Sequence, residues 1–310
     1  MNISNAFLIL LNLFILLIAP FFVLGIIKKT KAFWGGRKGV SIFQPVYDVV
    51  KLFKKDRVIS SSTSWIFNLA PVVIFITTLF AGLFAPMVFG YSIINIEAAF
   101  IIFSYILGFG KFFALISAMD TASSFEGMGT SREACFTTIV EPAFFIILGS
   151  VVALSNDFTF AGLTKIISNF GTYGVLVAIM ASFALLIMLL VECSRVPVDD
   201  PTTHLELTMI HEVMILDNSG VDLALITWAS GMKMVILMSL IANIILPYGL
   251  ELKILLPLFL GILLILAFAI GTIEAAIARL RMSHVFEFVF IMSSFALVVV
   301  SLIAVKLYGV

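Results

Sequence analysis

Eight long apolar runs limit the folds open to this chain of 310 residues. The chain is 62% hydrophobic and 12% charged, whereas soluble domains carry about 25% charged residues. Each run approaches the roughly 20 residues that a helix needs to cross the hydrocarbon core, and none alternates as barrel strands do. We predict an all-α polytopic membrane protein, one integral membrane domain over 1–310, with helices near 3–27, 66–89, 93–118, 136–154, 174–191, 222–246, 254–272 and 285–307.

Lysine and arginine positions predict the orientation of these helices. The connections 28–65, 119–135, 192–221 and 273–284 share one side, and the first alone holds nine of the eighteen basic residues. Basic residues accumulate in cytoplasmic loops. We therefore expect large cytoplasmic loops and both termini outside a cell (inner or plasma) membrane. The other loops on the basic side add Arg132, Arg195, Arg279 and Arg281, and the opposite side keeps Lys165, Lys253 and Lys306.

The first of these loops contains an amphipathic segment over 42–57. Its apolar residues recur at helical spacing, with acidic and basic residues between them. This pattern is typical of a helix that lies along the membrane surface. The alternative is a basic anchor that only fixes orientation.

The segment 192–217 carries six carboxylates and two of the three histidines of the chain. Ionisable residues gathered beside a membrane indicate a functional site. Asp200 followed by Pro201 resembles a capped helix start, so we predict a helix from Asp200 to about Leu216 that ends at Ser219-Gly220. It would place His204, Thr208, His211 and Glu212 on one face and Glu206, Ile210, Val213 and Asp217 on another.

Charged residues also occur inside the predicted spans. Lys111 and Lys233 interrupt apolar runs, Glu141 lies in the fourth span and Glu97 begins the third. Neither lysine can easily extend its side chain to water, so we expect each to face a polar interior and a carboxylate, with Glu141 as the matching acid. Such a series of buried acids and bases suits a proton relay. The alternative is a set of static ion pairs that fix helix packing.

Several classes of site are not indicated. Cys135 and Cys193 form no C-x-x-C motif, so we expect no iron–sulfur cluster, metal or other cofactor in this chain. His211-Glu212 lacks the second histidine of a zinc protease helix. Gly35–Gly39 lacks the Gly-Lys-Ser/Thr order of a Walker A phosphate-binding loop. The net charge is zero, which does not favour nucleic acid as a partner. We expect no catalytic residue here.

Three ordered motifs resemble a known family. They lie in the three large loops and comprise Gly36-Arg37, Gln44-Pro45, Asp48, Lys51-Leu52 and Lys55-Asp56; Asp120-Thr121, Phe125–Gly129, Ser131–Glu133 and Glu141-Pro142; and Glu192, Arg195, Pro197, Asp199, Pro201 and Glu206-Leu207. Together they resemble the complex I membrane subunit that docks the peripheral arm. Thr202 and His204 depart from it, and residues 196–217 are similar to the corresponding subunit of membrane-bound group 4 [NiFe] hydrogenases, including formate hydrogenlyase and ferredoxin-linked, energy-converting enzymes.

The resemblance implies a non-catalytic anchor that links hydrogen chemistry to proton or sodium translocation. Its partners would be the hydrogenase large and small subunits, a ferredoxin-like iron–sulfur subunit and antiporter-like membrane subunits within the lipid bilayer, and those partners would carry the nickel–iron centre and the clusters. The ion pathway would comprise Glu97, Lys111, Glu141, Glu192, Asp199, Glu206, Glu212 and Lys233. Partner docking would involve Arg37, Gln44, Asp48, Lys51, Arg132, Arg195, Asp200, His204 and His211.

Other functions remain open at this point. The chain could supply the quinone site of a complex I-like NADH or ferredoxin dehydrogenase, or belong to a related sulfur-reducing complex. A stand-alone cation or proton antiporter is the third possibility. Large asymmetric loops of both charge signs favour docking, and no internal repeat with broken helices of the transporter type is evident.

Overall fold

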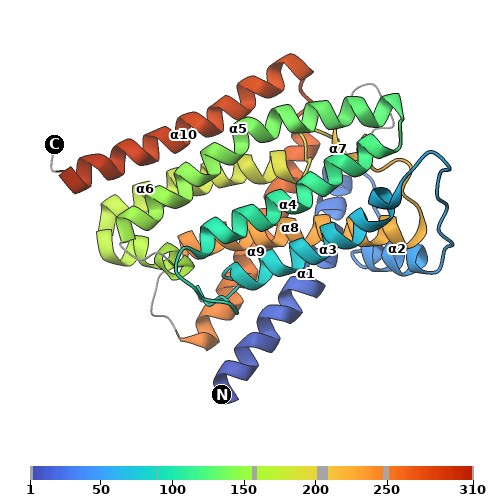
Figure 1. Ribbon diagram of the computed structural model, residues 1–310. Helices are drawn as coiled ribbons and strands as arrows, with labels where there is room; N and C mark the ends of the chain where they lie inside the picture. The colour runs from blue at the N-terminus through green and yellow to red at the C-terminus, as the bar shows by residue number, and fades with distance from the viewer. Residues whose placement is uncertain (1–2, 89, 156–158, 201–208, 247–250, 309–310) are drawn as a thin grey trace.

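The described part of the chain contains eight helices that are long and apolar enough to cross a membrane. Figure 1 shows them gathered in one bundle. The structure is a computed structural model and describes residues 3–88, 90–155, 159–200, 209–246 and 251–308. The helices are α1 (Ile3–Trp34), α2 (Gln44–Phe53), α3 (Trp65–Phe84), α4 (Ala99–Asp120), α5 (Ser124–Ser155), η1 (Phe160–Lys165), α6 (Ile166–Glu192), α7 (His211–Met214), α8 (Gly220–Ile245), α9 (Leu252–Ala276) and α10 (Met282–Tyr308). All membrane-length helices expected from the sequence are present, and the all-α fold is confirmed.

Helix α8 lies at the centre of the bundle and packs against α1, α3, α6 and α9. Its second half, from Met234 to Ile244, is buried on every side. The other long helices bury one face and expose large apolar residues on the other. This arrangement fits a bilayer, because hydrocarbon can solvate the exposed apolar faces while each helix satisfies its own backbone hydrogen bonds.

The first loop ends at a helix start that is held by a carboxylate. Ser64 caps α3, and the Asp120 carboxylate accepts hydrogen bonds from the Ser64 backbone N at 2.7 Å and the Phe67 N at 3.3 Å. The carboxylate at the end of α4 therefore satisfies free N–H groups at the start of α3. This contact ties the two helices together at the end of the bundle that we call the loop side, where α2 and α7 also lie (Figure 1).

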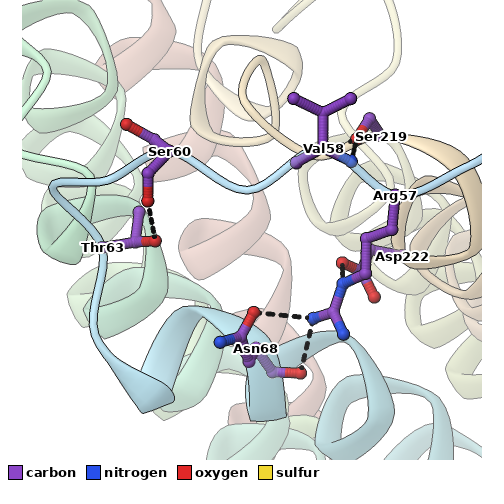
Figure 2. Close-up of polar contacts among 7 residues, drawn as sticks. All are labelled: Arg57, Val58, Ser60, Thr63, Asn68, Ser219 and Asp222. Atoms are coloured by element: carbon purple, nitrogen blue, oxygen red, sulfur yellow. Dashed lines mark hydrogen bonds and ion pairs between the residues drawn. The ribbon is translucent and has the colours of Figure 1, made fainter.

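Figure 2 shows a second attachment on the loop side. Arg57 pairs with Asp222 in the first turn of α8 and donates to the backbone O and Oδ1 of Asn68 in α3, at 3.1 and 2.9 Å. Beside it, the Ser219 hydroxyl accepts a hydrogen bond from the Val58 backbone N at 2.9 Å and donates one to the Val58 backbone O. The connection between α2 and α3 is thereby fastened to two membrane helices.

Two predicted boundaries are wrong because helices extend beyond the apolar runs. The first helix continues to Trp34, so Lys28, Lys29 and Lys31 lie on its last turns. Residues 124–135 were expected in a loop, yet α5 begins at Ser124 and only residues 121–123 connect it to α4. Charged residues do not stop a helix, because they can reach water or a partner from its last turns.

The helix predicted from Asp200 to Leu216 is not what the structure shows. Residues 201–208 lie outside the described part of the chain, and between 209 and 216 only His211–Met214 is helical. Ser219-Gly220 does not end that helix but begins α8, with Gly220 at φ +53. The residues from 209 onward are instead held by tertiary contacts, which override a local helical pattern.

Candidate functional site: a buried ion cluster

The two lysines within the membrane spans share one carboxylate. Glu192 is the last residue of α6. Its Oε1 lies 2.6 Å from Lys111 Nζ, on α4, and its Oε2 lies 2.7 Å from Lys233 Nζ, on α8. The Glu192 side chain is 8% exposed. Each lysine faces a carboxylate, but the matching acid expected from the sequence, Glu141, is wrong, and Glu192 is the carboxylate for both.

A second carboxylate, Glu133, joins this cluster from α5. Its Oε1 lies 3.3 Å from Lys111 Nζ, which also donates to Thr137 Oγ1 at 3.0 Å. Glu133 and Thr137 are four residues apart and therefore share one face of α5. Two cations and two carboxylates thus balance one another, which offsets the large cost of removing each charge from water.

A cavity of about 70 Å³ adjoins these charges. Its walls include Lys111, Glu133, Glu192 and Lys233, together with polar Ser230. A space of this size with several polar partners can hold a few water molecules, since a water needs roughly 10–15 Å³ by the same measure. Water held in this space would give protons a route between charged groups that do not touch directly.

The segment 209–218, which we call the plug, forms part of the cavity wall on the loop side. His211, Met214, Ile215 and Asn218 line the cavity wall. Lys111 precedes the end of α4 at Asp120 by nine residues, about 14 Å along a helix. Glu192, the last residue of α6, and the plug therefore line the same cavity.

Buried Asp199 anchors the start of the plug. Its Oδ2 accepts from the backbone N of Ile210 and of His211, both at 3.0 Å, and its Oδ1 lies 3.1 Å from Arg279 Nη2. Asp199 is fully buried. The carboxylate therefore satisfies backbone donors that have no helical partner and links the plug to the α9–α10 connection.

Buried Glu126 and half-buried Arg132 hold the plug against α5. Glu126 Oε1 accepts from the Asp217 backbone N at 3.2 Å, and Arg132 Nη1 donates to the Met209 O at 2.8 Å. Gly129 lies between them, and a Cβ there would meet Val213 Cγ1 at 2.3 Å and the Ile210 O at 2.8 Å. The plug is thus seated on a helix face that requires glycine.

A neighbouring network connects the loop side of α1 and α9. Glu274 contacts Arg195 Nη1 at 3.3 Å and Lys31 Nζ at 3.8 Å, and Lys31 also reaches Asp200 at 3.4 Å. Arg195 and Asp200 were expected to dock a partner, but the structure places them in this internal network, where the Arg195 side chain is 12% exposed.

The remaining expected ion-path residues do not all join the cluster. Glu141 lies on the exposed face of α5, where its Oε1 approaches Gly108 of α4. Glu97 is exposed in the connection before α4 rather than inside a span. Glu212 is half-buried in α7, and Glu206 lies outside the described residues.

The expected docking residues divide between surface and interior. Arg37 and Lys51 are exposed on the loop side, and Gln44 Nε2 donates to Asp48 Oδ1 at 2.8 Å within the surface helix α2. His211 instead lines the cavity, and Arg132 binds the plug. His204 falls outside the described residues.

Four contributing residues were missed from the sequence. Glu133 was assigned to a loop and so was not considered as a buried partner for Lys111. Glu126, Asn218 and Glu274 are each buried, and nothing local in the sequence marks them as such. A helical reading of residues 124–137 would have placed Glu133 one turn before Thr137 and drawn attention to that face. Across the described ranges, no group of three or more His, Cys, Asp or Glu side chains could hold a metal ion.

Comparisons with known proteins define the family. The family model described as NADH dehydrogenase matches residues 6–305. Hydrogenase-4 component C of Escherichia coli strain K12 is 31% identical over 235 residues, which cover 76% of this chain and 73% of that protein. Formate hydrogenlyase subunit 4 of the same strain is 24% identical over 225 residues, 73% of this chain and 72% of that protein.

A solved structure shares the fold. It is a chain from an archaeal respiratory membrane complex, the membrane-bound sulfane sulfur reductase, with a TM-score of 0.78 and 19% identity over 97% of this chain and all of that chain. The family match spans nearly the entire sequence and includes every helix of the bundle. This chain is therefore a multi-pass membrane protein of the NADH dehydrogenase family.

Proposed function

We propose that this chain is the membrane subunit of a complex I-related hydrogenase complex, and that the Lys111–Glu192–Lys233 cluster is its proton-transfer site. The observation that carries the proposal is one carboxylate held between two lysines beside a cavity large enough for water. The names of the two bacterial relatives support hydrogen chemistry in the parent complex. The redox centres would reside on partner subunits.

The loop side is the proposed docking face for the soluble arm. It carries most of the basic residues outside the spans, including exposed Arg37 and Lys51. The plug lies at this face and also forms the cavity wall through His211 and Asn218. A partner that shifts the plug would therefore change the surroundings of Glu192 without touching it. Such a shift of a packed segment is a known way to couple distant sites.

Glu141 is the proposed lateral exit of this path. A carboxylate exposed on a membrane span is costly against lipid, so a neighbouring subunit or a water-filled path is expected to cover it. Its carboxylate approaches α4 at Gly108, one turn from Lys111. Antiporter-like subunits in the membrane would be suitable neighbours, with the loop side facing the cytoplasm of the cell membrane.

The test measures hydrogen evolution and ion uptake together in inverted membrane vesicles. Glu192→Gln keeps the shape of the side chain but removes the charge that both lysines share. We expect hydrogen evolution driven by an artificial donor to continue while proton or sodium uptake falls to the background of uncoupled vesicles. Glu251→Gln is the matched control, because Glu251 is exposed at the opposite end of the bundle, where α9 begins.

Two results would refute the proposal. Undiminished ion uptake by the Glu192→Gln vesicles would exclude the cluster as the transfer site. Copurification with a quinone-reducing assembly that lacks nickel, and no hydrogen evolution, would exclude the hydrogenase complex. An equal loss of ion uptake in the Glu251→Gln control would show a general effect of removing a negative charge and would also count against the proposal.

A further inference from the structure

Helices α9 and α10 follow one another in the chain but do not pack along their lengths. Both contact other helices: α9 packs on α1 and α8, and α10 packs on α5 and α6. Figure 1 shows α10 along one edge of the bundle while α9 runs away from it toward the opposite edge. Their divergence leaves a wedge whose floor is formed by α6 and α8, which do pack against each other.

The wedge is an open apolar groove of about 580 Å³. On α6, Val175, Ile179 and Phe183 form a stripe at a spacing of four residues, and they are 40%, 57% and 48% exposed. Apart from Ser182, every residue that lines the groove is apolar. In a bilayer this space is filled by hydrocarbon or by protein, because water there would find almost no polar partner.

The depth of the groove distinguishes between these two occupants. It begins where α8 ends, at Ile241 and Ile245, and reaches only the middle of α9 and α10, at Leu266 and Phe295. On α6 the groove runs from Val175 to Leu186, eleven residue steps or about 16 Å along a helix. Ile167 also lines it but adds little depth, because α6 is kinked at Gly171 and Ile166 lies against Gly174. The run from Val175 to Leu186 is about half of the roughly 30 Å hydrocarbon core. A lipid acyl chain extends through one leaflet, which matches the depth of the groove. A membrane-spanning helix would need a groove as deep as the whole hydrocarbon core.

A cation and an aromatic side chain lie near the level of Val175, although neither lines the groove itself. Lys306 Nζ lies 5.9 Å from the centre of the Tyr173 ring, on the last turns of α10 beside α6. Tyr173 is two residues from Val175, the first residue of the exposed stripe. Lysine and tyrosine are typical of the headgroup level, and an exposed lysine attracts anionic lipid.

We propose that the wedge between α9 and α10 binds one acyl chain of an anionic phospholipid, with the lipid phosphate at Lys306. The occupant lies in the leaflet on the side of the chain termini. It completes the packing between two helices that the chain itself leaves apart. This inference does not depend on the ion cluster or on the proposed hydrogenase partners.

Photo-crosslinking tests the proposal in the native assembly, reconstituted into liposomes. The probes are phosphatidylglycerol and phosphatidylcholine with the same diazirine in the middle of one acyl chain. Crosslinked residues are mapped by peptide mass spectrometry. We expect phosphatidylglycerol to label residues 175–186 and the region of Phe295 more strongly than the lipid-facing stripe of α1 at Leu10 and Phe14, although that stripe is more exposed.

Two variants separate the acyl-chain site from the headgroup site. Ile179→Trp fills the groove and should lower groove labelling by both lipids, relative to the α1 stripe in the same sample. Lys306→Gln should reduce the preference for phosphatidylglycerol about five-fold, the factor expected for one basic residue near a membrane surface. Lys38→Gln, at the exposed loop side, makes the same change in net charge and should leave that preference unchanged.

Three outcomes would overturn the inference. Equal labelling of the groove and the α1 stripe would identify ordinary annular lipid. Absence of groove labelling, with crosslinks from residues 175–186 to another subunit instead, would identify a protein occupant. An unchanged lipid preference in Lys306→Gln would exclude the phosphate contact.

Discussion

Lys233 Nζ lies 2.7 Å from Glu192 Oε2, although Glu192 is the last residue of α6 and Lys233 lies midway along α8. The contact is possible because α6 ends at the depth of the middle of α8. Glu192 is the carboxylate partner of Lys233 in the described residues, whereas Lys111 has Glu133 as well. This asymmetry predicts how the cluster responds to substitution.

Glu192→Gln should destabilise the protein more than Lys233→Met. The first leaves the Lys233 ammonium buried without a carboxylate, which typically costs about 3–5 kcal/mol. The second leaves Glu192 paired with Lys111. The double variant should therefore be more stable than Glu192→Gln alone. Thermal unfolding of the detergent-solubilised protein, followed by helical circular dichroism, gives the ranking, and a double variant less stable than both single ones would contradict it.

The fold could be predicted from the sequence because hydrocarbon imposes one strong requirement on every span. Twenty apolar residues in a row have few alternatives to a membrane helix, so the helices were found although several of their ends were not. Trp34 and Ser124 show why: charged residues continue a helix into water without any change in local pattern. Helix ends depend on tertiary contacts such as those of Asp120 with α3.

The site was predictable only in part. Lys111 and Lys233 stand out because charge within an apolar run is rare, and this signal is local. Their shared partner depends on α6 ending at Glu192 and on the depth of three helices relative to one another, which no spacing rule supplies. Glu133 was hidden by the misplaced start of α5. The plug follows no helical pattern because Asp199 and Glu126 hold its backbone.

Gly25→Ala should disrupt the packing of α1 beneath the surface helix. A Cβ at Gly25 would lie 2.0 Å from the Ile42 backbone O, a separation that requires the backbone to move. Overpacking of this kind typically costs about 1–3 kcal/mol. Gly261→Ala in α9 is the matched control, because nothing lies within 4 Å of its Cβ and alanine favours the helix. Equal unfolding temperatures of the two variants would refute the close approach.

Cys193 should react slowly with maleimide at neutral pH. Burial raises the pKa of the Cys193 thiol to about 11, against the opposing effect of nearby Lys233 and Arg195. Because the thiolate is the nucleophile, only a small fraction is reactive at pH 7. In a Cys135→Ser background we expect slow labelling of the native protein, a rate that rises with pH toward 11, and fast labelling after denaturation. Rapid native labelling at pH 7 would contradict this.

The same thiol should make stability depend on pH in the alkaline range. An ordinary thiol has a pKa of 9.0, so the unfolded chain loses this proton before the folded chain does. The stabilising contribution is present in full below pH 9 and is lost as pH rises from 9 to about 11. The difference in unfolding temperature between the wild type and Cys193→Ala should therefore change across this window and stay constant below it.

Arg57→Lys should loosen the connection between α2 and α3. Arginine bridges Asp222 on α8 and Asn68 on α3 through separate nitrogens of one guanidinium, as Figure 2 shows. A lysine ammonium cannot reproduce that planar fork. Because the Arg57 side chain is 34% exposed, we expect a loss of only about 1 kcal/mol. Local opening should then become about five-fold more frequent.

Limited proteolysis measures this opening directly. Chymotrypsin should cleave after Phe53, which is 41% exposed at the end of α2, faster in Arg57→Lys than in the wild type. Arg37→Lys makes the same substitution at an exposed position in the preceding connection and should leave the cleavage rate unchanged. Because Ser219 and Val58 still hold the connection from the other side, Ser219→Ala combined with Arg57→Lys should accelerate cleavage further. A double variant cleaved no faster than Arg57→Lys alone would show that the two attachments do not act together.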